Sequence, residues 1–428
     1  MEEIVKKRFV LCYHRVENLY DDFNMISVSK DNFKAHIDYL KKNFDIVPFE
    51  NIVDTSKDNH SVAITFDDGY YDLFTNVLPI LEIFKIPATM FISTGNIDTL
   101  NENWTDNILR SIYLPCIQHD FFEVNDSYVS GKWRTQTMDD RVKLYSIIRT
   151  LFQHANTEEK KKLEKCLLNW SGHTIKGRKD RRMLSVSELQ ELAKNPLITI
   201  GAHTVTHCSL KWQSRQEQIN EIRESKKFIE TVIKKEVSNF AYPFGTANDY
   251  TSETIDILKS EGFKRAGVVK NELITDETDV FQIPRFTVRN YELSEFKNFI
   301  DKIINTQQRS IEKKSSVSKI SYIGLLKEDI DLMNEENKFV IWGCGYWGIK
   351  LLEELSSMGY GDRILAFGDN DINKNGKCIE NKKVMECQDV LQMLSKEKII
   401  ILIKGMHDWE IADELIKKGL YNIHILLR

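Results

Sequence analysis

Val62-Ala63-Ile64-Thr65-Phe66-Asp67-Asp68-Gly69 is the stretch that decides the fold. A largely apolar run ends there in two carboxylates and a glycine. Apolar residues then recur at helical spacing, at Leu73, Val77, Leu81 and Phe84. This order predicts a strand, a loop and a helix. Neighbouring strand residues point to opposite faces, but the turn at Gly69 can aim both carboxylates at one cleft. Taken alone, Asp-Asp-Gly is also consistent with an ordinary turn.

A second polar block, Gly201-Ala202-His203-Thr204-Val205-Thr206-His207, follows another short apolar run, Pro196–Ile200. Its two histidines are four residues apart, a spacing that places side chains on one face of a helical turn. Alone, such a pair is more often a surface or capping pair. One carboxylate and two imidazoles together leave coordination positions open for water and substrate, as a catalytic divalent metal requires. We therefore expect a metal-dependent amide hydrolase.

The two blocks resemble motifs of the polysaccharide deacetylase (NodB-homology) family. The first motif, Thr-Phe-Asp-Asp-Gly, is intact at Thr65–Gly69, and the second, His-(Ser/Thr)-x-x-His, is present at His203–His207. The third motif, Arg-x-x-Pro-Tyr in many members, falls on Phe240–Gly245, where the Arg is missing and Phe244 replaces the Tyr. Leu11–Val16 resembles the Tyr-His-Arg segment of the circularly permuted branch of the family.

The resemblance implies an α/β fold, a distorted (β/α) barrel of the polysaccharide deacetylase type. It spans roughly residues 8–97 and 183–290, on both sides of an expected helical insertion at about 98–182. We expect this domain to cover residues 1–300. Residues 301–320 are polar and lose their apolar periodicity, which predicts a linker to a second domain.

By the same resemblance, Asp68, His203 and His207 are the metal ligands, with zinc as the first candidate, and Asp67 is the general base. The chemistry agrees with this division. A bound divalent ion polarises a carbonyl and acidifies its water, so a carboxylate alongside can take the proton. The resemblance also assigns the backbone N–H of Phe244 to the oxyanion of the tetrahedral intermediate. Only this N–H is needed, so Phe in place of Tyr costs little.

The leaving amine must be protonated, and His14 is our candidate acid, because imidazole exchanges its proton near neutral pH. The alternative is a structural histidine at a strand end. In family members with the third-motif Arg, that residue orients the base, which Phe240 cannot do. Arg285 is a candidate substitute, with a solvated surface arginine as the alternative. Trp104, which opens the insertion, can either stack on a sugar ring or anchor the insertion to the barrel.

Length and composition fit a two-domain enzyme: 428 residues, of which 42% are apolar. The net charge of -5 and the pI near 6.1 argue against nucleic acid as a partner. The apolar run Phe9–Tyr13 is too short for a secretory signal, and no run reaches membrane-spanning length. Seven cysteines without close pair spacing are consistent with reduced thiols, Cys208 among them as a small buried residue. We therefore expect a cytoplasmic protein without a transmembrane segment.

Residues 321–428 alternate strand-like and helix-like segments, which predicts a small Rossmann-like, doubly wound domain. Its first turn reads Gly343-Cys344-Gly345-Tyr346-Trp347-Gly348, and Asp369 follows the next strand-like run. In a dinucleotide site such glycines let the backbone approach the pyrophosphate, and the acid holds a ribose hydroxyl. We expect Gly343, Gly345, Gly348 and Asp369 to bind a nucleotide or nucleotide sugar. The alternative is a scaffold or dimerisation module, which would make the protein a homo-oligomer.

Together these features predict a metal-dependent hydrolase that removes an N-acyl group, acetyl first, from an amino sugar. A cytoplasmic enzyme would meet such sugars in nucleotide-linked or lipid-linked form, during the biosynthesis of a surface glycan. A first alternative is a nucleotide-sugar-binding protein whose barrel is weak or inactive, since the third-motif Arg is missing. A second is an iron-dependent oxygenase, because two histidines and a carboxylate also suit that metal.

Overall fold

A computed structural model describes residues 7–19, 22, 24–54, 60–125, 129–312, 321–323, 338–357, 359–371, 374–394, 399–403, 415, 418, 420 and 423–426. The chain divides into two compact units, Met1–Asn305 and Thr306–Arg428. Each unit is described by itself below. Among the described residues, no helix combines the length and the apolar character that a membrane crossing requires.

A closed ring of seven parallel strands forms the centre of the first unit. In spatial order the strands are β1 (Arg8–Tyr13), β12 (Ile283–Thr287), β11 (Arg265–Val269), β10 (Asn239–Ala241), β9 (Ile198–Ala202), β6 (Ala88–Ile92) and β5 (Ser61–Phe66). The ring closes because β1 pairs with β5 over its whole length, from Arg8 beside Ser61 to Tyr13 beside Phe66. The short strand β4 (Asp45–Ile46) lies outside the ring, on β5. The predicted (β/α) barrel is therefore confirmed.

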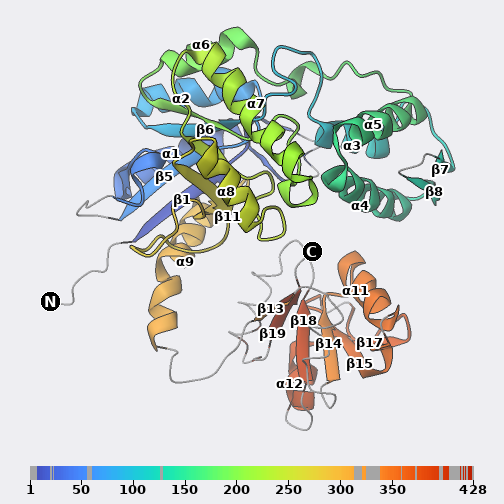
Figure 1. Cartoon of the computed structure of the whole chain (residues 1–428). Coiled ribbons are helices and arrows are strands. Elements are labelled where there is room, and N and C mark those ends of the chain that lie inside the picture. The colour runs from blue at the N-terminus through green and yellow to red at the C-terminus, as the bar shows by residue number, and fades with distance from the viewer. Residues whose placement is uncertain are drawn as a thin grey trace. The chain divides into compact units, whose positions relative to one another are not determined.

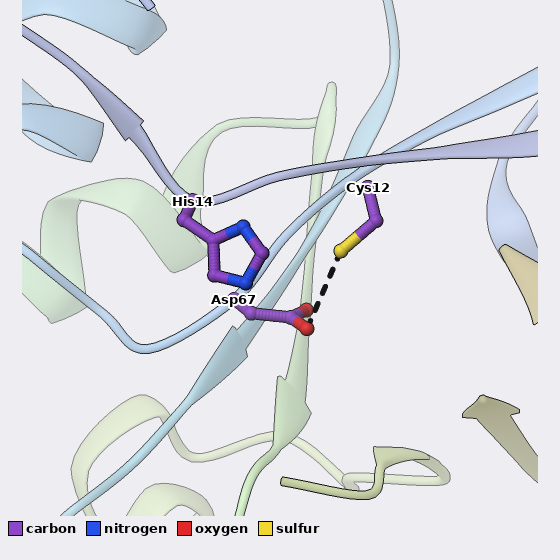
Figure 2. A group of neighbouring side chains, drawn as sticks. All are labelled: Cys12, His14 and Asp67. Atoms are coloured by element: carbon purple, nitrogen blue, oxygen red, sulfur yellow. Dashed lines mark hydrogen bonds between the residues drawn. The ribbon is translucent and has the colours of Figure 1, made fainter. Parts of the chain in front are cut away.

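The closing pair β1 and β5 brings two distant polar segments together, since both strands end at the same rim of the barrel. His14 follows β1 and Asp67 follows β5, and Figure 2 shows these two side chains beside Cys12. Carboxyl ends of parallel strands with helical crossovers are the usual place for a catalytic site in this architecture.

Helices pack on the outside of the barrel (Figure 1). They are α1 (Lys30–Asn43), α2 (Leu78–Phe84), α6 (Val186–Lys194), α7 (Arg215–Ile233), α8 (Ser252–Ser260) and α9 (Leu293–Glu312). Shorter elements are the helical turns η1 (Phe49–Asn51), η2 (Leu73–Val77), η3 (Lys179–Arg181) and η4 (Leu210–Trp212), and the paired strands β2 (Arg15–Val16) and β3 (Ser27–Val28). Each long helix buries one apolar stripe, Ile222 and Ile229 in α7 for example.

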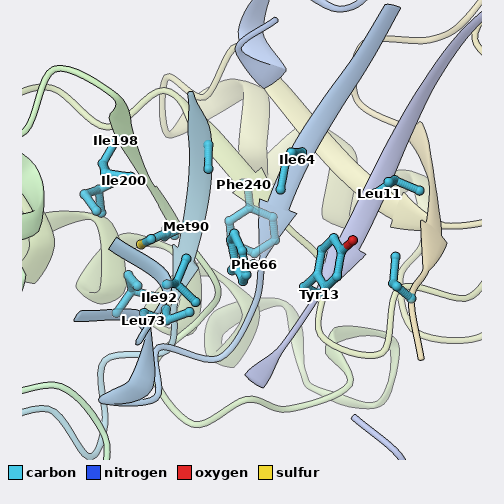
Figure 3. Packing of buried hydrophobic residues seen from close by; sticks show 14 of the residues in the cluster. Leu11, Tyr13, Ile64, Phe66, Leu73, Met90, Ile92, Ile198, Ile200 and Phe240 are labelled. Atoms are coloured by element: carbon cyan, nitrogen blue, oxygen red, sulfur yellow. The ribbon is translucent and has the colours of Figure 1, made fainter. Parts of the chain in front are cut away.

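Alternate residues of each strand face either these helices or the barrel interior. In β5, Ile64 and Phe66 join the outer core, whereas Ala63 belongs to the smaller inner cluster. Figure 3 shows the outer core around Ile64, Phe66 and Phe240. Since both faces of the strands are buried, the sequence of β5 is apolar almost throughout. Asp67 therefore stands out in a position where an apolar residue is the rule.

The segment between β6 and β9 forms a lobe with its own core. It contains α3 (Trp104–Tyr113), the hairpin strands β7 (Phe121–Asn125) and β8 (Ser130–Arg134), α4 (Met138–His154) and α5 (Thr157–Ser171). Trp104, Ile108 and Phe152 are among the residues of this core. The lobe is the expected insertion, and Figure 1 shows its three helices grouped together. The hairpin was not expected from the sequence.

Helix α9 extends to Glu312, so it includes residues 301–312, which we expected in the linker. Phe296, Ile300 and Ile303 are buried at helical spacing. This apolar stripe explains why the helix continues past residue 300, as far as Ile303. Residues 313–320 lie outside the described part of the chain.

The second unit is built on one sheet with the order β13-β19-β18-β14-β15-β17-β16. The strands are β13 (Ser321–Ile323), β14 (Lys338–Trp342), β15 (Ile364–Gly368), β16 (Cys378–Ile379), β17 (Lys382–Met385), β18 (Ile399–Ile403) and β19 (Ile423–Leu426). The other elements are α11 (Tyr346–Ser357), η6 (Gly361–Arg363) and α12 (Cys387–Leu394). Only β16 is antiparallel among the described pairs. From β14 the chain continues to β15 on one side and later to β18 on the other, which is a doubly wound order.

Candidate active site

Asp67 and Asp68 leave the barrel rim through a tight turn. Asp68 has a positive φ of 74° and Gly69 one of 91°. An aspartate in this left-handed region is costly and persists only where its surroundings hold it, which is common at functional sites. The turn points the carboxylate of Asp67 toward Arg285. It points the carboxylate of Asp68 toward two histidines of the second block.

Asp67 forms a buried ion pair with Arg285. Nη1 of Arg285 donates to Oδ1 at 2.7 Å and Nη2 donates to Oδ2 at 2.8 Å, while neither side chain is more than 4% exposed. The surface alternative for Arg285 is therefore wrong. Burial raises the pKa of Asp67, but Arg285 together with His203 and His14 outweighs it, and the net pKa is lowered. Asp67 is thus an ionised carboxylate in a fixed orientation.

Asp68 faces both histidines of the second block. Its Oδ1 lies 3.2 Å from Nε2 of His207 and 3.7 Å from Nε2 of His203. The three ligand atoms lie within 4.8 Å of one another, and all three residues are buried. Oδ1 of Asp68 has no hydrogen-bond partner among the described residues. A buried carboxylate oxygen without a hydrogen bond, facing two imidazole nitrogens, is the environment that a divalent cation fits.

His203 presents the correct nitrogen for a metal. Its Nδ1 lies 2.7 Å from the carbonyl oxygen of Ala241, so Nδ1 carries the hydrogen and Nε2 keeps its lone pair. Burial is the largest influence on this imidazole and lowers its pKa to about 4. Burial raises the pKa of Asp68, but the nearby His207, His14 and His203 together outweigh it, and the net pKa is lowered. A neutral His203 and an ionised Asp68 are the protonation states that ligands require.

The two histidines meet through a loop and not through the helical turn that their spacing suggested. Strand β9 ends at Ala202, and Thr204 and His207 have positive φ values of 64° and 51°. The expectation of a helix was therefore wrong, although both side chains reach the same place. Cys208, directly after the loop, is buried and lies outside both clusters of candidate ligands among the described residues.

His14 lies beside Asp67, together with Cys12 (Figure 2). The thiol of Cys12 donates to Oδ2 of Asp67 at 3.4 Å, and burial raises the pKa of this thiol, so it stays protonated. Nδ1 of His14 has no hydrogen-bond partner among the described residues. Because Arg285 occupies both oxygens of Asp67, this second cluster suits a cation less well than Asp68 and the two histidines do. Sequence reasoning missed Cys12, although alternation places residue 12 on the face of residue 14.

Phe244 has a backbone N–H without an acceptor among the described residues, and its ring borders His207. Its φ is 61°, and its N–H donates to no group in the described part of the chain. Its ring packs edge-on against His207, with 4.8 Å between the centroids. The N–H is thus available at the site, as the oxyanion role requires.

Trp104 serves as an anchor rather than as an open stacking platform. It is 7% exposed and stacks on Phe152, with 5.3 Å between the ring centroids. Its indole N–H is also engaged, at carbonyl oxygens of the loop that carries His207. A sugar ring cannot lie on a face that is already covered, so the stacking alternative is wrong.

The glycine turn of the second unit has three distinct environments. Gly343 has a φ of 95°, and apart from chain neighbours no described atom lies within 4 Å of a Cβ placed on Gly343 or Gly345. A Cβ on Gly348 would meet the carbonyl oxygen of Gly343 at 1.7 Å. These are the tight turn, the open approach and the close packing that the three glycines of a dinucleotide fingerprint supply. The side chains of residues 346 and 347 lie outside the described part.

Asp369, the expected ribose ligand, is engaged within the unit. Its Oδ2 accepts from the backbone N–H of Cys344 at 3.1 Å, from the Cys344 thiol at 3.0 Å and from Nζ of Lys374 at 3.1 Å. A ribose hydroxyl would have to share or replace these donors. Lys374 beside the turn is a further cation that sequence reasoning missed.

The chain is similar in sequence to known proteins. The family model for polysaccharide deacetylases matches residues 54–113 and 134–266. Poly-beta-1,6-N-acetyl-D-glucosamine N-deacetylase of Staphylococcus aureus (strain MSSA476) is 24% identical over 295 residues, which are 65% of this chain and 77% of the relative. The Staphylococcus epidermidis protein of the same name is 22% identical over 297 residues, 65% of this chain and 78% of its own length.

Two solved structures are similar at lower identity. The Streptococcus pyogenes deacetylase PplD in complex with acetate has a TM-score of 0.45 and 15% identity, covering 69% of this chain and 98% of that one. IcaB from Ammonifex degensii has a TM-score of 0.44 and 16% identity, covering 70% and 98%. The family match includes Asp67, Asp68 and both histidines, whereas His14 and Arg285 lie outside it.

Proposed function

The chain contains a polysaccharide deacetylase domain, and from this premise we propose that it is a metal-dependent hydrolase that removes the N-acetyl group of an amino sugar. One observation carries the proposal: Oδ1 of Asp68 is buried without a hydrogen bond among the described residues and faces Nε2 of His203 and of His207. The ionised Asp67 lies next to this group.

Asp68, His203 and His207 would hold the divalent ion, and zinc is the first candidate for two imidazoles and a carboxylate. When bound there, such an ion polarises the amide carbonyl and makes a water molecule more acidic. Three protein ligands leave room for both. The tautomer of His203 is fixed for this role by the carbonyl of Ala241.

Asp67 is proposed as the general base. Arg285 holds its carboxylate in one orientation and keeps it ionised, yet each oxygen retains lone pairs that can accept a proton from water. Arg285 thereby does what the missing third-motif Arg does in other family members. The observation weakens the alternative of an inactive barrel, which rested on that missing residue.

The N–H of Phe244 is proposed to donate to the oxyanion, and His14 to protonate the leaving nitrogen. His14 lies beside Asp67, and its Nδ1 has no hydrogen-bond partner in the described chain. Water can thus be deprotonated and nitrogen protonated by two different groups, as amide hydrolysis requires.

His14→Ala is expected to lower turnover by roughly 100-fold or more on an unactivated amide, in line with loss of a general acid. On an aryl acetate the loss should be much smaller, because a phenolate leaves without protonation. Rates of amine and phenol release by the same preparation check this. The partly buried His173 is the control position. Equal losses on both substrates would return His14 to a structural role.

For the substrate we propose an N-acetylated amino sugar of a surface glycan, either as polymer or as a nucleotide-linked or lipid-linked precursor. The named relatives deacetylate a polymer of N-acetylglucosamine. An iron-dependent oxygenase is disfavoured, because the family match covers all three proposed ligands and points to hydrolysis.

For the second unit we propose a nucleotide or nucleotide-sugar site at Gly343, Gly345 and Gly348, beside Asp369. Its support is the doubly wound strand order, with the glycine turn after β14, where strands diverge to both sides. A scaffold or dimerisation module stays the alternative.

Gly345→Ala is expected to abolish nucleotide binding without loss of stability. Apart from its chain neighbours, the added methyl group meets no described atom within 4 Å, so we expect it to interfere mainly with a ligand that approaches the backbone. Calorimetry of the full chain with UDP, UDP-N-acetylglucosamine and NAD⁺ measures the binding, and thermal unfolding is the control. Absence of binding to the wild-type chain at about millimolar ligand, far above typical nucleotide affinities, would contradict the proposal.

A further inference from the structure

The loop between His203 and His207 is held by a buried carboxylate from helix α7. Oε2 of Glu221 accepts from the backbone N–H groups of Val205 and Thr206, both at 2.8 Å. Its Oε1 accepts from the hydroxyl of Thr206 at 2.7 Å. Glu221 is 7% exposed. Three short hydrogen bonds to two consecutive loop residues leave this part of the loop little freedom.

The insertion holds the same loop with other groups. The indole N–H of Trp104 is shared between the carbonyl oxygens of Thr206, at 3.1 Å, and His207, at 3.3 Å. Nζ of Lys160, on α5, lies 3.3 Å from the hydroxyl oxygen of Thr206. Trp104 belongs to the core of the insertion, where it packs on Phe152. The carbonyl groups of Thr206 and His207 are thus tied to the insertion, and the N–H groups of Val205 and Thr206 to α7.

His207 needs such external support more than His203 does. Nδ1 of His203 is fixed by a carbonyl oxygen, whereas Nδ1 of His207 is buried and has no hydrogen-bond partner among the described residues. A metal-binding histidine is normally oriented through its second nitrogen. For His207 the other constraints are its own backbone, the carboxylate of Asp68 at Nε2, and the neighbouring rings of His203 and Phe244.

The backbone of His207 is in the left-handed region, with a φ of 51°. Non-glycine residues keep such a conformation only where neighbouring groups impose it. The groups that bond to this stretch include Trp104, Lys160 and Glu221, and the backbone N–H groups of Thr94 and Gly95. We propose that Glu221 and Trp104 are positioning residues for His207, so that the insertion is a structural part of the metal site.

This inference rests on the proposed metal-dependent function. Trp104→Phe removes the shared N–H and keeps an aromatic ring in the core. Glu221→Ala removes all three acceptor contacts, and Glu221→Gln restores an acceptor oxygen for the backbone N–H groups. Two matched controls exist. Trp170 also donates its indole N–H to a carbonyl in the insertion, that of Phe121 at 2.9 Å, and Glu217 lies one turn earlier on α7 and bonds to Ser214.

The experiment measures the dissociation constant of Zn²⁺ for the full-length variants, by competition with a chromophoric chelator, with thermal unfolding of the metal-free proteins in parallel. Trp104→Phe and Glu221→Ala are expected to weaken zinc binding by about 10-fold or more, the usual effect of losing support around a metal ligand. Trp170→Phe and Glu217→Ala should change it by less than about 2-fold, and Glu221→Gln should recover most of the affinity.

Equal zinc affinities in each variant and its matched control would overturn the inference and leave the proposed function intact. If Trp104→Phe does not fold, the ratio between Glu221→Ala and Glu217→Ala decides. A wild-type chain that binds no zinc, or binds it equally well without His203 and His207, would instead overturn the proposed function.

Discussion

Asp67→Asn is expected to lower deacetylation by about 100-fold to 10,000-fold while the protein keeps its metal, the range found for loss of a general base. Asparagine has nearly the same shape but cannot take a proton from water. Asp67 belongs to a group separate from the proposed ligands, because Arg285 occupies both of its oxygens. Amine release and metal content, measured on one preparation, check both halves of this expectation.

The variant should also be less stable, because Arg285 keeps its charge in a buried place and loses its partner. Asp72→Asn is the matched control. Asp72 is likewise buried and pairs with a buried arginine, Arg15, at 3.5 Å. It should lose stability but retain turnover per folded molecule. Comparable loss of turnover in both variants would show that the effect of Asp67→Asn comes from the broken ion pair and not from a missing base.

Asp68→Asn, His203→Ala and His207→Ala are each expected to lose bound metal, and with it all measurable turnover. Each removes one of three ligands whose atoms lie within 4.8 Å of one another. Metal content by elemental analysis after dialysis gives the result, with His173→Ala as a control for loss of a histidine elsewhere. Stoichiometric metal in the double variant His203→Ala, His207→Ala would contradict the assignment of the site.

The barrel could be predicted because its signal is local. In β5 a run of buried residues ends in Asp67 and Asp68, and in β9 a similar run ends before His203. Such strand ends converge in any parallel barrel, and the roles of the proposed ligands came from the resemblance to the family motifs.

The partners of Asp67 could not be predicted in the same way. Arg285 is 218 residues away in sequence, and only the closure of the ring through β12 brings it to Asp67. The sequence shows an arginine after a proline in a strand, which fits a surface equally well. Cys12 lacked a signal for a similar reason, since a cysteine in an apolar strand normally indicates packing.

The loop of the second block shows a limit of periodicity. A spacing of four residues suggests one helical face, but positive φ values at Thr204 and His207 produce the same convergence in a loop. Nothing in the sequence indicates such values, because neither residue is a glycine. We infer that contacts from separate elements hold these values, among them the hydrogen bonds of Glu221 and Trp104 to the loop.

The most direct test of metal-dependent deacetylation is amine release by the full-length protein. Release is measured after removal of the metal and again after addition of one equivalent of zinc. The substrates are free, nucleotide-linked and β-1,6-linked N-acetylglucosamine. We expect no release above background by the metal-free protein and recovery with zinc on at least one substrate. The Asp67→Asn variant should not recover. Full turnover by the metal-free protein, or recovery of wild-type turnover by Asp67→Asn, would contradict this expectation.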